Sequence, residues 1–205
     1  PPARNAFRSL HGLHDKIVVL YSGNHTTSTP LPTLLDAAVA LRACTTLPFV
    51  FVGGGAGKDE VDAYVKRYDL ANVLTLPYQP KSALADSLSA ADVHVVSLGT
   101  HLAGVIHPCK VYGAMAVARP IIYFGPSPSH VSDILGECDN GWIVAHGDVA
   151  RAVAVLQQVA DLPRGALDAI GLRGRRAIDS RFDAAALCGA VADAVESSMH
   201  TGTRD

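Results

Sequence analysis

Short runs of apolar residues alternate with amphipathic stretches along most of this chain. Within the runs, β-branched and other apolar residues follow one another almost without interruption, which is typical of strands buried on both faces of a sheet. Most runs end at glycine or at a cluster of turn residues, which marks the end of a strand. This pattern predicts six strands, at residues 16–23, 48–55, 72–78, 92–99, 119–125 and 141–148.

The stretches between these runs carry the spacing of amphipathic helices. In residues 58–70, for example, Val61, Val65 and Tyr68 fall on one helical face. The same spacing recurs after most of the other predicted strands. Helices are therefore expected at residues 31–44, 58–70 and 81–91, from about residue 108, around residues 130–135, and from residue 149 onward with a break near Pro163.

Regular alternation of strand and helix predicts a doubly wound α/β domain, in which helices cover both faces of a six-stranded parallel sheet. We assign residues 1–15 to a linker, 16–200 to the domain and 201–205 to a frayed tail. In such sheets, ligands bind beyond the carboxyl ends of the strands. We therefore expect the site among the polar loops at those ends, at residues 24–30, 53–57, 78–80, 99–109 and 125–129.

Composition and charge indicate which partners and which cellular location to expect. A formal net charge of −2 provides no basic field, so nucleic acid is not expected as a partner. The four cysteines are scattered without CxxC spacing, which indicates reduced thiols in a cytoplasmic protein. No apolar run approaches the roughly 20 residues that a membrane helix needs, and the first residues do not resemble a signal peptide.

The glycine-rich turn GGGAGKDE, residues 53–60, matches neither common phosphate-binding motif. A P-loop needs glycine at Val52 and a hydroxyl residue at Asp59, and a dinucleotide fingerprint needs glycine at Lys58. The turn is either a tight strand-to-helix connection or a place where a ligand approaches backbone N–H groups. The loop SGNHTTSTP, residues 22–30, leaves the same alternatives open, since its polar groups suit either a diphosphate or the cap of a helix.

The stretch HPCKVYGAMA brings a histidine, a cysteine and a lysine together. The spacing of His101, His107 and Cys109 fits no common zinc pattern, so no metal is expected. A nucleophilic role for Cys109 lacks a residue placed to orient a partner base. We favour an anion site, because Pro108 suits the first turn of a helix and Lys110 lies beside its free N–H groups.

Taken together, these segments resemble a known family. The blocks that carry the resemblance occur in order as YSGNH, FVFVGGGAGKDEV, NVLTLPYQP, LSAADVHVVSL, HPCKVYGAMAVARPII and GWIVAHGD. They are similar to the C-terminal half of retaining glycosyltransferases of the GT-B fold, of the family-4 (group 1) type. The resemblance extends from about Arg4 to Phe182. It implies a Rossmann-like domain that binds a nucleotide-sugar donor, with an N-terminal acceptor-binding domain that is missing from this chain.

The resemblance implies a UDP- or GDP-linked sugar as substrate, with no cofactor and no metal. The sugar would pass to a hydroxyl of a polysaccharide or lipid-linked acceptor, as in exopolysaccharide biosynthesis, so we expect a cytoplasmic enzyme peripheral to the inner membrane. By position, the loop after the first strand would lie near the diphosphate, and the glycine turn near the nucleotide. The candidate donor- and phosphate-binding residues are Gly23, Asn24, His25, Gly53, Gly54, Gly55, Lys58, Tyr78, Gln79, His107, Pro108, Cys109 and Lys110.

Two departures from the family pattern leave alternatives open. Many relatives carry glutamates at the positions of Val105 and Gly113, and basic residues in the loop at residues 23–31, where this chain has none. A degenerate, non-catalytic domain that binds a partner is therefore one alternative. A sugar-nucleotide epimerase is another, although the chain shows no clear pair of acid and base carboxylates. An NAD-dependent oxidoreductase would need the dinucleotide fingerprint that is missing.

Overall fold

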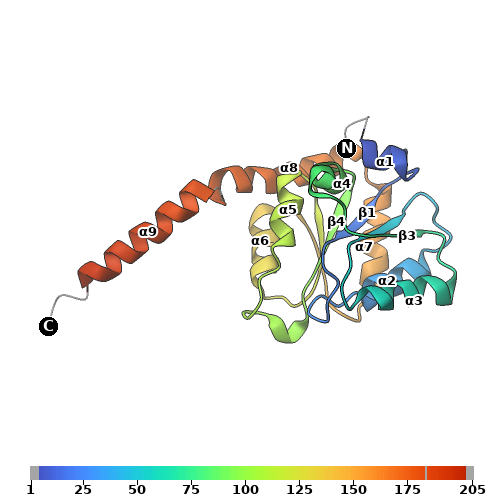
Figure 1. Ribbon diagram of the computed structural model, residues 1–205, viewed down its shortest axis with the longest axis horizontal. Coiled ribbons are helices and arrows are strands. Elements are labelled where there is room, and N and C mark those ends of the chain that lie inside the picture. The colour runs from blue at the N-terminus through green and yellow to red at the C-terminus, as the bar shows by residue number, and fades with distance from the viewer. Residues whose placement is uncertain (1–4, 183, 202–205) are drawn as a thin grey trace.

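The computed structural model describes residues 5–182 and 184–201 and contains a single six-stranded sheet (Figure 1). All neighbouring strands are parallel, in the order β3-β2-β1-β4-β5-β6. The predicted doubly wound sheet is thus confirmed, and each strand is shorter than its apolar run. The strands are β1 (Val19–Ser22), β2 (Phe49–Val52), β3 (Val73–Leu76), β4 (Val93–Ser97), β5 (Ile121–Phe124) and β6 (Gly141–Val144).

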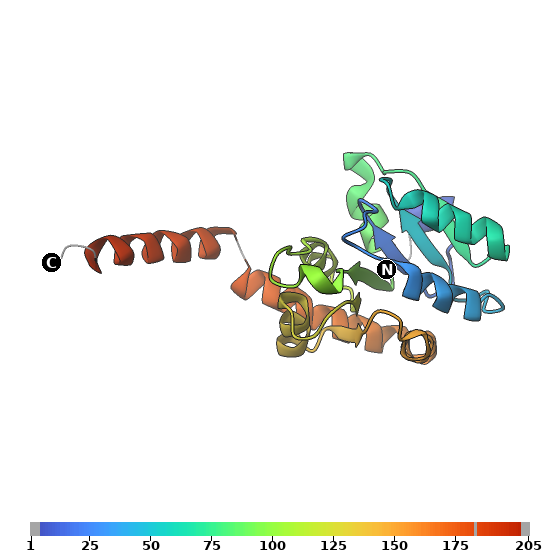
Figure 2. The same cartoon turned by 90° about the horizontal axis from the view of Figure 1, so that it is seen from below.

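Helices cover both faces of the sheet (Figures 1 and 2). Side chains alternate between the two faces along each strand, so Tyr21 and Phe51 face one helical layer while Leu20 and Val50 face the other. The first layer holds α2 (Pro32–Ala40), α3 (Lys58–Tyr68) and α7 (Val149–Asp161). The second layer holds α1 (Ala6–Leu10), η1 (Lys81–Ala83), α4 (Leu84–Ser89), α5 (Lys110–Ala116), α6 (His130–Cys138) and α8 (Arg164–Arg181).

Several helices differ in extent from the prediction. The helix expected over residues 31–44 ends at Ala40, and the one expected over 81–91 divides into η1 and α4. A short 3₁₀ segment, η2 (Thr100–Leu102), follows β4. The predicted face of α3 is only partly buried, since Val61 is fully covered while Tyr68 is exposed. The predicted break near Pro163 is confirmed, because that residue separates α7 from α8.

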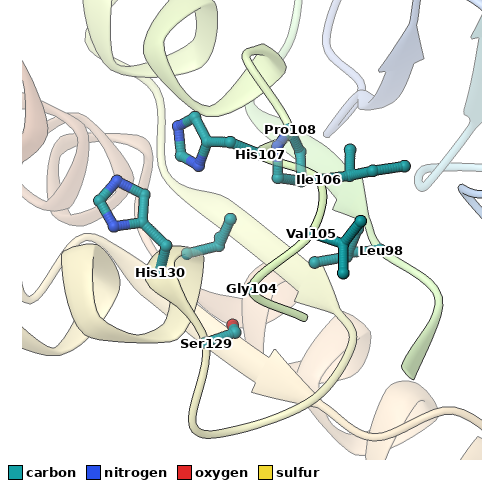
Figure 3. A pocket seen from close by; sticks show the side chains of 9 residues that line it. Leu98, Gly104, Val105, Ile106, His107, Pro108, Ser129 and His130 are labelled. Carbon is teal, nitrogen blue, oxygen red and sulfur yellow. The ribbon is translucent and has the colours of Figure 1, made fainter. Parts of the chain in front are cut away.

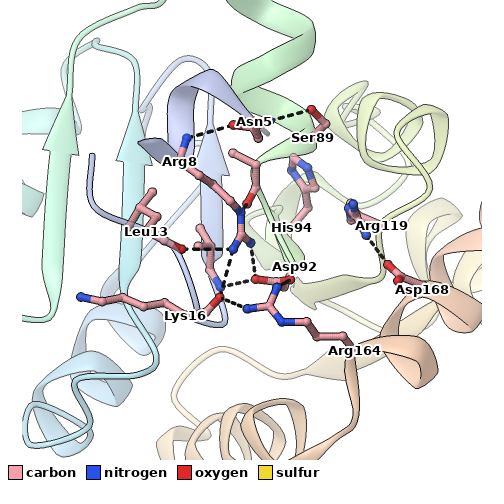
Figure 4. A network of polar contacts seen from close by, with 12 residues as sticks. Asn5, Arg8, Leu13, Lys16, Ser89, Asp92, His94, Arg119, Arg164 and Asp168 are labelled. Carbon is pink, nitrogen blue, oxygen red and sulfur yellow. Dashed lines mark hydrogen bonds and ion pairs between the residues drawn. The ribbon is translucent and has the colours of Figure 1, made fainter. Parts of the chain in front are cut away.

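Residues 5–15, which the sequence assigned to a linker, include α1 and pack against the domain (Figure 4). Asn5 caps α1 and also donates a hydrogen bond from Nδ2 to the backbone oxygen of Asp86 at 2.8 Å. Arg8 is buried and donates to the backbone oxygens of Ala90 and Leu13 and to the carboxylate of Asp92. A single arginine among polar residues gives no periodic signal, so its buried partners could not be predicted from the pattern.

The last helix, α9 (Ala184–Thr201), extends away from the sheet in both views (Figures 1 and 2). The predicted frayed tail began at residue 201. The helix includes Thr201, and residues 202–205 lie outside the described residues. Among the helices that the structure describes, none is long and apolar enough to cross a membrane.

Candidate functional site

Two glycine turns meet at the carboxyl ends of β1 and β2. Because Ser22 pairs with Val52, the residues that follow the two strands lie side by side. The amide of Gly23 donates to the oxygen of Val52 at 2.9 Å, and the amide of His25 donates to the oxygen of Gly54 at 2.8 Å. The sequence placed these turns in one site, and the structure brings them into direct contact.

Neighbouring protein atoms leave no room for a side chain at glycines of both turns. Gly53 has a φ of +131°, and a Cβ at this position would lie 2.0 Å from the backbone oxygen of Gly23. A Cβ on Gly55 would lie 2.1 Å from Oδ1 of Asn24, and one on Gly23 would lie 2.7 Å from Cε of Lys110. The tight-connection alternative therefore accounts for Gly53 and Gly55, without any need for a ligand there.

We predict that Gly53→Ala will lower the free energy of unfolding by about 1–3 kcal/mol, because the methyl group would displace the neighbouring turn and force a strained φ. Urea unfolding would measure the change. Gly54→Ala is the matched control, since a Cβ there meets only the exposed ring of Tyr78, at 3.1 Å. Equal losses of stability in the two variants would contradict this explanation of Gly53.

Lys110 lies over these turns, although it belongs to α5. Its Nζ donates to the phenol oxygen of Tyr21 at 3.2 Å and to the backbone oxygen of Asn24 at 3.2 Å. No carboxylate of the described residues forms an ion pair with it. Burial lowers the pKa of Lys110 from its ordinary value. The result is a half-buried ammonium group without a counter-ion, held beside Gly23.

Tyr78 closes one side of this arrangement from the loop after β3. Its hydroxyl donates to Oδ1 of Asn24 at 3.2 Å and lies 3.3 Å from the backbone oxygen of Gly54, while 58% of the residue is exposed. Gln79 instead bonds back to the oxygen of Pro77. Lys58, at the start of α3, pairs with Asp62 at 2.6 Å, so its charge is already compensated.

His25 turns into the core, although the sequence placed it among the ligand-facing residues. It is fully buried, and its ring contacts that of Tyr21 with centroids 4.8 Å apart. Burial and the charges of Lys58 and Lys110 lower the pKa of His25, so the imidazole is neutral near pH 7. It therefore supplies no positive charge to the site. Its ring fills space beneath the turns, with Nδ1 3.4 Å from the backbone oxygen of Gly54.

On one flank of the loop before α5, His107 lines a cavity (Figure 3) that Lys110 does not line. Its Nε2 is 3.0 Å from the hydroxyl of Tyr112, and its ring is 4.3 Å from that of His130. Cys109 is exposed, with its sulfur 3.7 Å from the backbone oxygen of His107. This flank opens into a cavity of about 340 Å³ lined by Leu98, Gly104, Val105, Ile106, His107, Pro108, Ser129, His130 and Val131.

The helix expected from Pro108 begins at Lys110 and spans only seven residues. The carbonyl of Pro108 accepts from the amide of Val111 at 3.2 Å, and that of Cys109 accepts from Tyr112 at 3.2 Å. Within the described part of the chain, no group of three or more His, Cys, Asp or Glu side chains is placed to hold a metal ion.

A second cavity, of about 210 Å³, lies between α4 and α5 and reaches Lys110. Gly113 opens it, since the nearest atom to a Cβ there would be Cδ1 of Leu88, at 4.0 Å. His94 forms part of its wall, with Nε2 2.9 Å from the oxygen of Leu88, and burial lowers the pKa of His94 to about 4. The cavity is lined by Ser22, Gly23, Leu84, Leu88, His94, Val95, Lys110 and Gly113.

The lining of this second cavity includes apolar leucine and valine side chains and a single ammonium group, that of Lys110. It suits a ligand that joins an uncharged ring to an anion, which is the chemistry of a nucleotide. Residues 16–161 match the family model described as glycosyl transferases group 1. The chain belongs to the group 1 glycosyltransferases. The family resemblance inferred from the sequence is thereby confirmed, and neither the epimerase nor the non-catalytic alternative is favoured.

Proteins similar to this group 1 chain are longer than it is. It is 32% identical over 114 residues to the putative colanic acid biosynthesis glycosyl transferase WcaI of Escherichia coli K12, covering 55% of this chain and 28% of that protein. A crystal structure of Anabaena Alr3699/HepE in complex with UDP and glucose has a TM-score of 0.76 at 16% identity, covering 93% of this chain and 51% of that one. The chain thus spans about half or less of these relatives.

A third similarity indicates which half of such a protein this group 1 chain resembles. The C-terminal domain of a group 1 family protein, LpcC of Francisella tularensis, has a TM-score of 0.67 at 16% identity. The match covers 90% of this chain and 95% of that domain. The fold is that of the C-terminal, Rossmann-like half of the GT-B glycosyltransferases, as the sequence predicts.

Proposed function

We propose that this chain binds the nucleotide-sugar donor, UDP- or GDP-linked, of a glycosyl transfer reaction. One observation carries the proposal: the uncompensated ammonium of Lys110 lies beside Gly23, at the carboxyl end of β1. The chain moves outward from β1 to β3 and then returns to β4 on the other side of β1. Ligands of doubly wound sheets bind at this reversal of strand order.

The proposed role of Lys110 follows from the chemistry of the leaving group. When a glycosyl group leaves its donor, negative charge develops on the diphosphate, and a fixed cation nearby stabilises it. Residues 23–31 contain no Arg or Lys, and Lys58 is paired with Asp62. We therefore assign the diphosphate to Lys110 and the loop after β1, and the nucleoside to the cavity between α4 and α5.

We propose that the acceptor side of the reaction belongs to a separate, N-terminal domain of the complete enzyme. We propose that the complete enzyme transfers a sugar with retention of configuration to a polysaccharide or lipid-linked hydroxyl at the inner-membrane surface. The similarity to a protein named for colanic acid biosynthesis supports an exopolysaccharide as product. The positions of Val105 and Gly113 carry no carboxylate. The hydroxyl groups of the nucleotide sugar would therefore be bound there without a negatively charged hydrogen-bond acceptor.

Calorimetric titration of the 205-residue chain tests the donor proposal. UDP or GDP is expected to bind with a Kd between about 1 μM and 1 mM, a range typical of substrate affinities. Uridine and guanosine, which lack the diphosphate, should bind much more weakly because Lys110 would have no anion to contact. If neither diphosphate binds, the chain is not a donor-binding domain and the non-catalytic alternative becomes the better explanation.

A further inference from the structure

Tyr21 contacts Lys110 from within the sheet. It belongs to β1, and only 1% of its surface is exposed. Its hydroxyl donates to the backbone oxygen of Asn24 at 2.9 Å and lies 3.0 Å from Oγ1 of Thr29. A buried phenol needs hydrogen-bond partners, and those of Tyr21 are the loop after β1 and Lys110.

The hydroxyl of Tyr21 and the ammonium of Lys110 form one hydrogen-bonded unit. Nζ of Lys110 donates to the phenol oxygen at 3.2 Å, and both groups donate to the same backbone oxygen, that of Asn24. Nζ also lies 4.9 Å from the centre of the Tyr21 ring, within the range of a cation–π contact. In the described residues, the phenol is the side-chain acceptor that Lys110 has in place of a carboxylate.

The backbone around this unit is shaped to admit the lysine. The side chain of Lys110 passes so close to Gly23 that a Cβ there would meet its Cε at 2.7 Å. The same phenol bonds both ends of the turn at residues 24–29, through Asn24 and Thr29. One hydroxyl therefore connects the cation with the loop that lies beside it.

We propose that Tyr21 is a positioning residue, which holds the Lys110 ammonium beside the loop at residues 24–29, in the place where it receives the donor diphosphate. The inference rests on the proposed function of the same site. A free lysine side chain loses rotamer freedom when it is fixed, which opposes binding. Because Tyr21 fixes the side chain before the ligand arrives, less of this freedom is lost on binding.

A double-mutant cycle tests this role. The Kd of UDP, or of GDP if that ligand binds more tightly, would be measured for the natural chain, Tyr21→Phe, Lys110→Met and the double variant. Tyr21→Phe should weaken binding about 3- to 10-fold, which corresponds to one hydrogen bond. The double variant should bind no more weakly than Lys110→Met alone, because the phenol acts through the lysine.

Tyr123→Phe provides the matched control. Tyr123 is also fully buried, and its hydroxyl bonds to Oγ of Ser129 at 3.1 Å, away from Lys110. Removal of this hydroxyl should leave the affinity within about twofold, the usual scatter of such changes. Equal weakening in Tyr21→Phe and Tyr123→Phe would overturn the proposal. So would a Tyr21→Phe chain that fails to fold while the control folds, since the hydroxyl would then be structural.

The pH profile adds a measurement that a purely structural role would not change. The affinity requires the ammonium form, so it falls as the pH rises through the lowered pKa of Lys110. Without the phenol the ammonium loses an acceptor, and this fall should begin at a lower pH in Tyr21→Phe. Titration of the ligand is common to both chains and cancels in the ratio of their affinities. Unchanged profiles, or effects that multiply in the double variant, would overturn the positioning role. Failure of the natural chain to bind any nucleoside diphosphate would instead reject the proposed function.

Discussion

Replacement of Lys110 by methionine is expected to weaken nucleoside diphosphate binding about 10- to 100-fold. A hydrogen bond that involves a charged group contributes about 1.5–3 kcal/mol, and the diphosphate would lose the nearby cation. Lys58 cannot compensate, because it pairs with Asp62, and the loop after β1 holds no Arg or Lys. Methionine keeps most of the length of the side chain, so the packing beside Gly23 should survive.

Calorimetry with UDP and GDP would measure this effect, with Lys66→Met as the control. Lys66 is exposed on α3 and bears the same charge, so its loss changes the net charge equally without touching the site. The control should bind like the natural chain. If Lys110→Met binds as tightly as Lys66→Met, Lys110 does not contact the diphosphate, even if the domain still binds a nucleotide.

The sequence predicted Lys110 as a site residue, but for a reason that the structure changes. We based the prediction on a helix that begins near Pro108 and offers free N–H groups. The helix begins at Lys110 and is short. What distinguishes Lys110 is its side chain, which reaches across to β1 and meets Tyr21. Spacing along a chain cannot reveal such a contact, because the two residues lie 89 positions apart.

Other residues of the site show the same limit of pattern analysis. Tyr21 sits in the apolar run of a strand, where periodicity counts it as one more core residue. His107 was grouped with Lys110 because the two are close in sequence, yet it contacts Tyr112 and His130 and lines a different cavity. Direction of a side chain within an irregular loop depends on tertiary packing, which the sequence pattern does not encode.

The six strands and both helical layers followed from the alternation of apolar runs, because burial on two faces leaves a strong local signal. The buried charges did not follow from it. Arg8 and Asp92 are 84 residues apart in sequence, and in the structure their side chains are only 4% and 3% exposed. Only the folded structure brings two such residues together. Removal of one of the two charges tests how the segment before β1 is held against the domain.

Asp92→Ala is expected to lower the free energy of unfolding by about 3–5 kcal/mol, the usual cost of leaving a buried charge unpaired. The carboxylate accepts hydrogen bonds from Arg8, from Arg164 at 3.0 Å and from the amide of Val18 at 2.7 Å (Figure 4). All three donors would lose their partner at once, and Arg8 would remain buried. Urea unfolding followed by circular dichroism would measure the loss.

Asp179→Ala is the control, because Asp179 pairs with Arg175 on an exposed part of α8 and exposed ion pairs contribute little. Its unfolding midpoint should stay close to that of the natural chain. The Arg8→Met/Asp92→Ala double variant tests the cause of the loss. If the loss in Asp92→Ala comes from the unpaired guanidinium of Arg8, the double variant should be more stable than Asp92→Ala alone. A double variant that is less stable than Asp92→Ala would show that Arg8 is held by the backbone oxygens of Leu13 and Ala90 rather than by the carboxylate.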